Sequence, residues 1–299
     1  MSIDLPTVNT VSGTPRVSLL RVKSALRAAL AEPRREGRTI GLVPTMGYLH
    51  DGHLSLLRAA RAQCDVVVMS LFVNPTQFGP GEDLERYPRD EERDLRLAGE
   101  AGADLVYAPP VDEVYPYDFG TAVEVSGNLT SVLDGDPARR GAAHFRGVTT
   151  VVAKLFNTVQ PDVAYFGQKD AQQAAVIRRM VRDLDFPLHV EVLPTVREPD
   201  GLAMSSRNAY LSEADRERAV ALSRALRAAE EGARAGSLAA GLEAARRELD
   251  AAGIEPEYLE ARDPDLLEPV NELDGRPVLV AVAARVGGAR LIDNVLIRP

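Results

Sequence analysis

One strand–turn–helix segment near the N-terminus restricts the fold of this chain more than any other. Residues 40–43 form a short apolar run typical of a buried strand, and the apolar spacing that begins at Leu54 predicts an amphipathic helix. The turn between them contains Gly47 and Gly52, which tolerate tight backbone geometry and let an anion approach the chain closely. Because the first N–H groups of a helix have no partner within it, the segment predicts an anion-binding turn.

The same turn carries two histidines, which an ordinary phosphate loop does not need. His50 and His53 lie on either side of Gly52 in the string His-Asp-Gly-His. Imidazole supplies N–H donors and, when protonated, a positive charge, and both stabilise charge that grows on a phosphate. A surface pair at a helix start and a zinc site are the alternatives, but no third ligand with suitable spacing lies nearby in the sequence.

Strand and helix patterns alternate along the first two thirds of the chain. Residues 66–73, 104–108, 163–166 and 188–196 are apolar runs typical of buried strands, and residues 148–159 carry a strong helical stripe. This alternation predicts an α/β fold with a Rossmann-like, doubly wound parallel sheet. We also expect a helix over residues 17–30 that ends before Pro33, and a short strand over residues 122–125.

The composition changes beyond Pro194, and we place a domain boundary there. Residues 1–194 are expected to bind the nucleotide and an acid substrate. Residues 195–299 are expected to form a smaller C-terminal α+β lid domain, with alanine-rich helices broken near Gly236 and a hairpin turn at residues 286–289.

Composition excludes several classes of protein. A net charge of −9 offers no broad basic surface for nucleic acid, and no apolar run approaches the length of a membrane span. Cys64 is the only cysteine, so an internal disulfide is impossible, and no secretory signal pattern opens the chain. We expect a cytoplasmic protein that binds neither nucleic acid nor a membrane.

Polar residues follow the predicted strands. Asn74 and Gln77 come after the run at residues 66–73, and Lys169 comes after the run at residues 163–166. Because ligands bind beyond the carboxyl ends of strands in an open α/β sheet, these side chains stand at the expected site. An isolated lysine is usually only a surface residue, but one at this edge is suited to contact a phosphate.

A second candidate for polyphosphate binding lies near the predicted domain boundary. Ser205, Ser206 and Arg207 follow a turn at residues 200–201, and their hydroxyl and guanidinium donors suit a polyphosphate. A loop position also permits closure over a nucleotide. Alone, a Ser-Ser-Arg string is more typical of a helix cap, but its pairing with the two-histidine turn favours nucleotide binding.

Together these motifs resemble the pantoate–β-alanine ligase family, which carries the HIGH-type signature of nucleotidylyltransferases. The matching strings, in order along the chain, are PTMGYLHDGH at 44–53, FVNPTQF at 72–78, HFRGV at 144–148, FGQKDAQQ at 166–173 and MSSRN at 204–208. The last of these is similar to the KMSKS-type loop.

The resemblance implies a set of functional residues. Catalysis is assigned to His50, His53, Lys169 and Arg207. The implied substrate-binding residues are Asn74, Gln77, His144 and Gln173. The implied ATP-binding residues are Met46, Gly47, Tyr48, Leu49, His50, Asp51, Gly52, His53, Gly167, Gln168, Lys169, Asp170, Val196, Met204, Ser205, Ser206 and Arg207.

Magnesium is expected with the ATP. Asp94 is the candidate metal ligand, and Asp83 is a second acidic candidate. The family can carry paired aspartates after a Tyr-Pro-Arg string, but Arg93 occupies the first of the two positions here.

The activity implied by the resemblance is an ATP-dependent condensation of (R)-pantoate with β-alanine, carried out by a cytoplasmic homodimer. The route would pass through a pantoyl adenylate and release AMP and pyrophosphate. Two alternatives stay open: another adenylyl- or cytidylyltransferase with a different nucleophile, and a nucleotide-sensing module that binds ATP without turnover.

Overall fold

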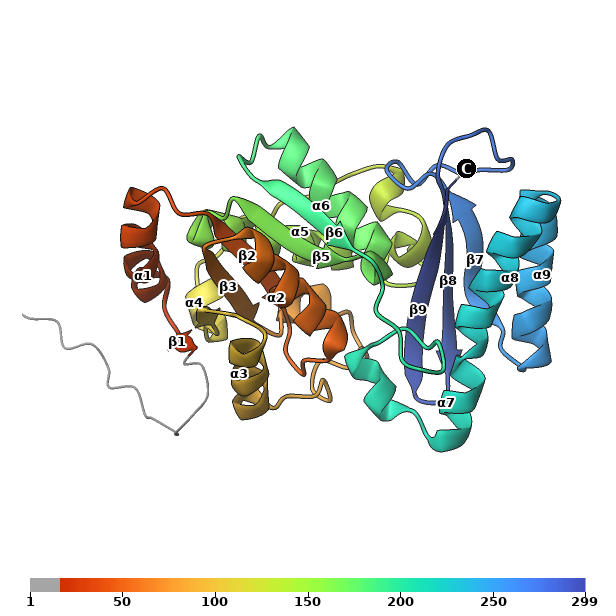
Figure 1. The fold of residues 1–299 in the computed structure, drawn as a ribbon, viewed down its shortest axis with the longest axis horizontal. Helices are drawn as coiled ribbons and strands as arrows, with labels where there is room; N and C mark the ends of the chain where they lie inside the picture. Colours follow the sequence, from red (N-terminus) through yellow and green to blue (C-terminus); the bar gives the residue numbers. More distant parts are fainter. Residues whose placement is uncertain (1–16, 299) are drawn as a thin grey trace, which may run out of the picture.

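The computed structural model describes residues 17–298, which form two units with separate sheets (Figure 1). The first sheet has six parallel strands in the order β1-β4-β3-β2-β5-β6. Its strands are β1 (Ser18–Leu20), β2 (Ile40–Thr45), β3 (Val66–Leu71), β4 (Leu105–Tyr107), β5 (Val163–Gly167) and β6 (His189–Leu193). The helices of this unit are α1 (Lys23–Arg35), α2 (Asp51–Gln63), α3 (Glu91–Glu100), α4 (Val111–Val114), α5 (Gly141–Val159) and α6 (Ala171–Asp183).

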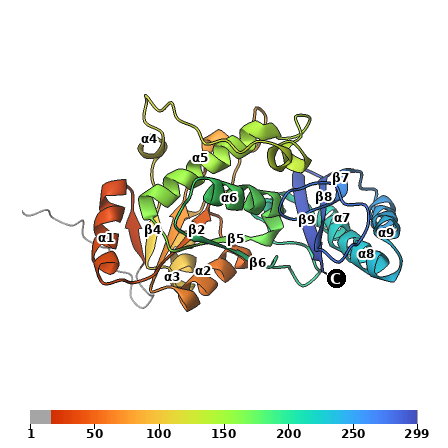
Figure 2. The ribbon, with the colours of Figure 1, turned by 90° about the horizontal axis from the view of Figure 1, so that it is seen from above.

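Helices cover both faces of this sheet, as Figure 2 shows from above. On one face α2 and α3 pack over Val43, Val67 and Met69. On the other face α1, α5 and α6 pack over side chains that alternate with those, including Leu42 and Val68. Strands covered on both sides must be apolar throughout, which is why they stand out as continuous apolar runs. The predicted doubly wound parallel sheet is confirmed.

The second unit is a three-stranded antiparallel sheet backed by helices. Its elements are α7 (Glu213–Ala219), α8 (Ala221–Ala235), α9 (Leu238–Ala251), β7 (Pro256–Arg262), β8 (Val278–Val286) and β9 (Ala289–Ile297). Val280 and Val282 of β8 face α8 and α9, whereas the intervening Ala281 packs with Leu129 and Phe145 of the first unit. The smaller α+β unit is confirmed, and the hairpin turn lies where it was expected. The boundary at residue 194 stays a prediction.

The predicted helix over residues 17–30 is wrong at both ends. Ser18–Leu20 form an edge strand because their backbone pairs with β4, a contact between distant segments that helical spacing cannot reveal. The following helix, α1, continues past Pro33 and closes at Gly37, whose backbone is left-handed with φ of +70°. Proline in the last turns removes only one N–H donor, and the helix tolerates the loss there.

The predicted strand at residues 122–125 is also wrong, because this segment joins neither sheet. The backbone of Val123 pairs with side chains of α5 instead. The Val123 N–H donates to Thr150 Oγ1, and the Val123 carbonyl accepts from Thr149 Oγ1. Across residues 17–298, no helix has both the length and the apolar character needed to cross a bilayer.

Candidate functional site

Two adjoining cavities lie beyond the carboxyl ends of β2, β3 and β5. The larger has a volume of about 780 Å³ and extends between the two units, and the smaller has a volume of about 210 Å³. Four of the five sequence motifs each contribute at least one residue that lines both cavities. The motif at 144–148 contributes different residues to the two, with His144 and Phe145 at the larger cavity and Val148 at the smaller. The shared residues are Met46, Gln77, Lys169, Asp170, Gln173, Ser205 and Arg207.

The two histidines cap the start of α2 and line the smaller cavity. His50 Nδ1 accepts a hydrogen bond from the Gly52 N–H (3.2 Å), and His53 Nδ1 accepts one from the His50 N–H (3.4 Å). A neutral imidazole whose Nδ1 accepts must carry its proton on Nε2. Both rings, whose centroids are 4.1 Å apart, therefore hold an Nε2–H donor. A Cβ at Gly52 would lie 2.8 Å from the His50 ring, so a larger residue at this position would displace that imidazole.

These imidazoles are neutral at pH 7. Burial lowers the pKa of His50 to about 4, and the charge of Lys169 acts in the same direction. Burial also lowers the pKa of His53 well below its ordinary value, with His50 and Lys169 contributing. The pair consequently serves as N–H donors in the ligand-free protein, and Lys169 supplies the fixed positive charge.

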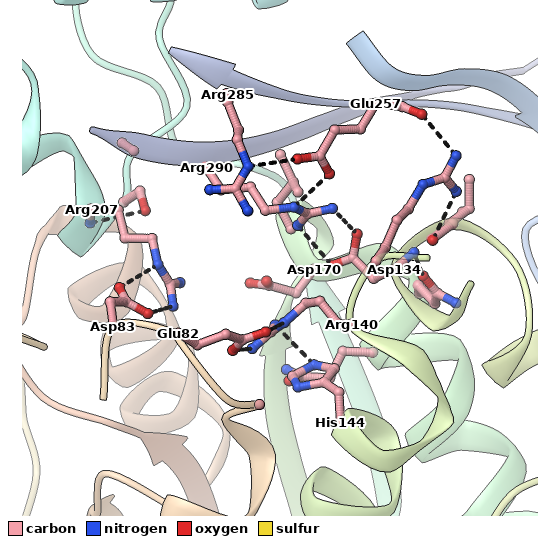
Figure 3. A pocket seen from close by; sticks show the side chains of 18 of the residues that line it. Glu82, Asp83, Asp134, Arg140, His144, Asp170, Arg207, Glu257, Arg285 and Arg290 are labelled. Atoms are coloured by element: carbon pink, nitrogen blue, oxygen red, sulfur yellow. Dashed lines mark hydrogen bonds and ion pairs between the residues drawn. The ribbon is translucent and has the colours of Figure 1, made fainter. Parts of the chain in front are cut away.

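The Ser-Ser-Arg segment (residues 205–207) lies against the histidine turn (residues 46–53). Ser206 Oγ donates to the Tyr48 carbonyl (3.3 Å), and Ser205 Oγ accepts from the Arg207 N–H (3.2 Å). The Arg207 guanidinium makes a two-pronged ion pair with Asp83, both contacts being 2.9 Å (Figure 3). Asp83 is thus paired with arginine, and the arginine faces the larger cavity.

Asn74 fixes the orientation of the Gln77 amide. Asn74 Oδ1 accepts from the Thr76 N–H (3.4 Å) and the Tyr115 hydroxyl (2.8 Å). Its Nδ2 must then point the other way, and it donates to the Gly147 carbonyl (3.2 Å) and to Gln77 Oε1 (3.1 Å). Because the Gln77 oxygen is occupied, its Nε2 is the group left to donate; it donates to Met46 Sδ (3.1 Å), and the side chain lines both cavities, where a carboxylate would be a natural partner for the remaining N–H.

His144 belongs to a charged cluster on the larger cavity that includes two residues the sequence did not single out as functional. Its Nε2 accepts from Arg140 (3.0 Å), which forces a proton onto Nδ1, and that nitrogen donates to the Gln77 carbonyl (2.8 Å). Glu82 pairs with Arg140 at 2.7 Å (Figure 3). Burial and the Arg140 charge lower the pKa of His144 to about 4.

The structure brings most of the predicted ATP-binding residues to the cavities, but not all of them. Gly167, Val196 and Met204 line the smaller cavity. The residues of the predicted set that line neither cavity are Gly47, Tyr48, Leu49, Asp51 and Gln168. Gln168 instead donates to Asn294 of the second unit (3.1 Å).

Asp94 also lies away from the cavities. It is buried under the histidine turn, and its two oxygens accept hydrogen bonds from the Tyr48 and Leu49 N–H groups. Within the described part of the chain, no cluster of three or more His, Cys, Asp or Glu side chains is arranged to hold a metal ion. The predicted use of Asp94 as a direct magnesium ligand does not fit this geometry.

Comparison with known proteins gives a consistent result. A family model described as pantoate-beta-alanine ligase matches residues 18–296. The pantothenate synthetase of Moorella thermoacetica is 56% identical over 284 residues, covering 94% of this chain and 99% of the relative. The pantothenate synthetase structure from Thermus thermophilus superimposes with a TM-score of 0.89 at 51% identity, covering 95% of this chain and 100% of the other. The pantoate-beta-alanine ligase of Francisella tularensis, complexed with beta-gamma ATP and beta-alanine, has a TM-score of 0.79 at 31% identity, covering 94% of this chain and 98% of the other.

Proposed function

This chain belongs to the pantoate–β-alanine ligase family and so joins pantoate to β-alanine, and we propose that it does so through a pantoyl adenylate, releasing AMP and pyrophosphate. The observation that carries the proposal is that two sets of hydrogen-bond donors lie at adjoining cavities. One set is suited to bind phosphate, and the other is suited to bind a carboxylate. His50 and His53, each with an Nε2–H donor, line the smaller cavity, whereas Lys169 and Gln77 line both.

The first proposed step forms a bond between a pantoate carboxylate oxygen and the α-phosphorus of ATP. The bond from that phosphorus to the bridging oxygen breaks, and pyrophosphate leaves. The carboxylate is already ionised at neutral pH, so this step needs positioning and charge stabilisation but no base. His50, His53, Lys169 and Arg207 are proposed to stabilise the phosphate charge, with Ser205 and Ser206 as further donors.

In the second proposed step the β-alanine amine attacks the carbonyl carbon of the adenylate. The bond from that carbon to the phosphate oxygen breaks, and AMP leaves with one oxygen from pantoate. The amine reacts in its neutral form, whereas an amine near the lysine reference pKa is mostly protonated at pH 7. It therefore loses a proton after it binds.

The substrate-binding roles of Asn74, Gln77, His144 and Gln173 are supported by their positions. Gln77 and Gln173 line both cavities, whereas Asn74 lines only the smaller one and His144 only the larger. ATP as the nucleotide is supported by the Francisella relative, which was solved with beta-gamma ATP and beta-alanine. Magnesium is proposed to enter with the triphosphate as MgATP, since the Asp83 and Asp94 carboxylates already have partners.

The proposal extends to cellular setting and assembly. A cytosolic location is supported by Cys64, which is buried against the Tyr165 hydroxyl and has no cysteine partner in the sequence. A homodimer is proposed from the family resemblance. The lid role of residues 195–299 is supported by the ion pair between Arg207 and Asp83 of the first unit, since both residues line the larger cavity.

Exchange of labelled pyrophosphate into ATP tests the proposed reaction and separates it from the two alternatives. We expect exchange to require pantoate and to proceed without β-alanine, because adenylation precedes attack by the amine. A panel of other carboxylic acids, alcohols and phosphates should support little exchange. Exchange with a phosphate or alcohol nucleophile would indicate another nucleotidylyltransferase, and ATP binding without exchange would indicate a sensing module.

Replacing Gln77 with alanine is expected to raise the KM for both pantoate and β-alanine, because its amide faces both cavities. Leaving a buried polar group without its hydrogen-bond partner costs on the order of 1–3 kcal/mol, which corresponds to an increase of about 5- to 150-fold. Steady-state kinetics with each substrate varied in turn would measure this. Gln77→Glu keeps the shape but replaces the N–H donors with an anionic oxygen, so it should be at least as damaging. Unchanged KM values in both variants would place the pocket elsewhere.

A further inference from the structure

Asp94 contacts the histidine turn through the backbone of that turn. The residue lies in the first turn of α3 and is 1% exposed. Its Oδ2 accepts a hydrogen bond from the Tyr48 N–H (2.7 Å), and its Oδ1 accepts one from the Leu49 N–H (2.7 Å). These short, charge-assisted contacts occupy both oxygens of the carboxylate.

The turn that Asp94 holds has an unusual backbone. Gly47 has φ of +88° and Tyr48 has φ of +51°, so two successive residues are left-handed. A left-handed backbone costs a residue with a Cβ roughly 1–2 kcal/mol, so Tyr48 needs surrounding contacts to stay there. A Cβ at Gly47 would lie 2.6 Å from Leu71 Cδ1 and 2.9 Å from Asp94 Oδ2, which leaves no alternative to glycine.

Contacts from two separate segments keep Tyr48 in place. The Arg93 guanidinium lies over the Tyr48 ring, 5.4 Å from its centroid, and Arg93 Nη1 is 3.8 Å from Asp94 Oδ1. From the Ser-Ser-Arg segment, Ser206 Oγ donates to the Tyr48 carbonyl. Tyr48 thus contacts both α3 and the Ser-Ser-Arg segment. His50 follows Tyr48 by only two residues, so the position of Tyr48 affects the position of His50.

We infer that Asp94 is a positioning residue, which holds the left-handed Gly47–Tyr48–Leu49 turn and thereby orients His50 and His53, and that it is not a magnesium ligand. The inference rests on the proposed function only for the catalytic consequence of that orientation. Leu49 leads directly into the N-cap residue His50, whose N–H is held in place because it donates to His53 Nδ1. Asp94 lines neither of the two cavities in which we place the nucleotide and its metal ion.

Asp94→Asn tests this inference, because asparagine keeps the shape but can accept only one of the two N–H groups. Its own NH₂ would face the other donor. We expect pantoate-dependent pyrophosphate–ATP exchange to fall about 5- to 150-fold, the range for an unpaired buried polar group. The Mg²⁺ concentration that gives half the maximal rate should stay unchanged, and excess Mg²⁺ should not restore the rate. The matched control is Glu92→Gln, which removes the same charge from an exposed position of the same helix and should keep the wild-type rate.

A raised Mg²⁺ requirement with recovery in excess Mg²⁺ would overturn the inference, and so would an unchanged rate in Asp94→Asn. A second measurement uses the wild-type protein and does not depend on activity or on folding of the variant. Mg²⁺ alone is titrated into the nucleotide-free protein while the amide resonances of Tyr48 and Leu49 are followed by NMR. We expect no saturable movement of either amide, and saturable movement of both would identify Asp94 as a metal ligand. A wild-type protein without exchange activity would contradict the proposed function, whereas the NMR result would still decide the role of Asp94.

Discussion

Replacing His53 with alanine is expected to slow pantoyl-adenylate formation by about 10²- to 10³-fold, the usual cost of losing one donor aimed at transition-state charge. ATP binding should weaken far less, because the Nε2–H acts mainly on charge that develops as the α-phosphorus is attacked. Rapid-mixing measurements of pyrophosphate release at saturating ATP and pantoate would report the rate of this step, and equilibrium titration would report ATP affinity.

His189→Ala is a suitable control for this variant. The His189 side chain is 69% exposed and pairs with Glu191 at the edge of the sheet, so adenylation should be unaffected by its loss. If the His53→Ala variant formed pantoyl adenylate at a near-normal rate, His53 would have no role in the mechanism. Because the pKa of His53 lies well below its ordinary value, the rate of the wild-type enzyme should also show no inflection from its protonation near pH 6.5.

The largest expected effect on stability comes from Arg290→Met at the contact between the two units. Arg290 of β9 makes a paired contact with Asp134 of the first unit at 2.9 Å and 3.3 Å (Figure 3). The Tyr258 hydroxyl donates to the same carboxylate. Removing one partner of a buried ion pair leaves an uncompensated charge, and we expect a loss of about 3–5 kcal/mol, as is typical of such pairs. Urea denaturation at pH 7 would measure the loss.

The same variant should show a distinct dependence on pH. Burial alone would raise the pKa of Asp134, but the Arg290 guanidinium, together with the Arg140 charge and the Tyr258 hydroxyl, outweighs burial and lowers this pKa below its usual value of 3.8. A lowered pKa in the folded state means that the pair stabilises the fold above pH 3.8 and loses this contribution as the pH falls through the folded-state pKa. In Arg290→Met, burial is no longer offset by this guanidinium, so Asp134 is expected to take up a proton above pH 3.8; the difference in stability from the wild type should shrink from there as the pH falls and be smallest below the wild-type folded-state pKa.

Arg285→Met provides the matched comparison for Arg290→Met. Its side chain is 76% exposed and contacts Glu257 at 3.3 Å, so its loss should change the free energy of unfolding by less than about 1 kcal/mol. Equal effects from the two arginines would contradict the assignment of the buried pair as the main polar contact between the units.

The fold class and the histidine turn were predictable because their signals are local. A strand that is buried on both faces must be apolar along its whole length, and the residues 40–43 and 66–73 show this directly. Likewise His50, Gly52 and His53 are neighbours in the chain, so their meeting at a helix start needs no knowledge of distant contacts. Edge strand β1 was not predicted from the sequence, because only its pairing with the distant strand β4 makes this segment a strand.

The charged part of the site was not predictable in the same way. Glu82 and Arg140, like Asp134 and Arg290, are ordinary charged residues until folding brings them together. The neutral state of His50 likewise follows from burial, which the sequence does not reveal. The metal role predicted for Asp94 came from the family pattern, whereas its actual partners are two backbone N–H groups that no pattern of side chains displays.

Transfer of ¹⁸O from the pantoate carboxylate is the most direct measurement of the proposed adenylate route. Attack at the α-phosphorus followed by cleavage of the carbon–oxygen bond places one pantoate oxygen in AMP. We therefore predict label in AMP and none in pyrophosphate or inorganic phosphate. Label in inorganic phosphate would show transfer of the γ-phosphoryl group through an acyl phosphate, and that result would contradict the adenylate mechanism.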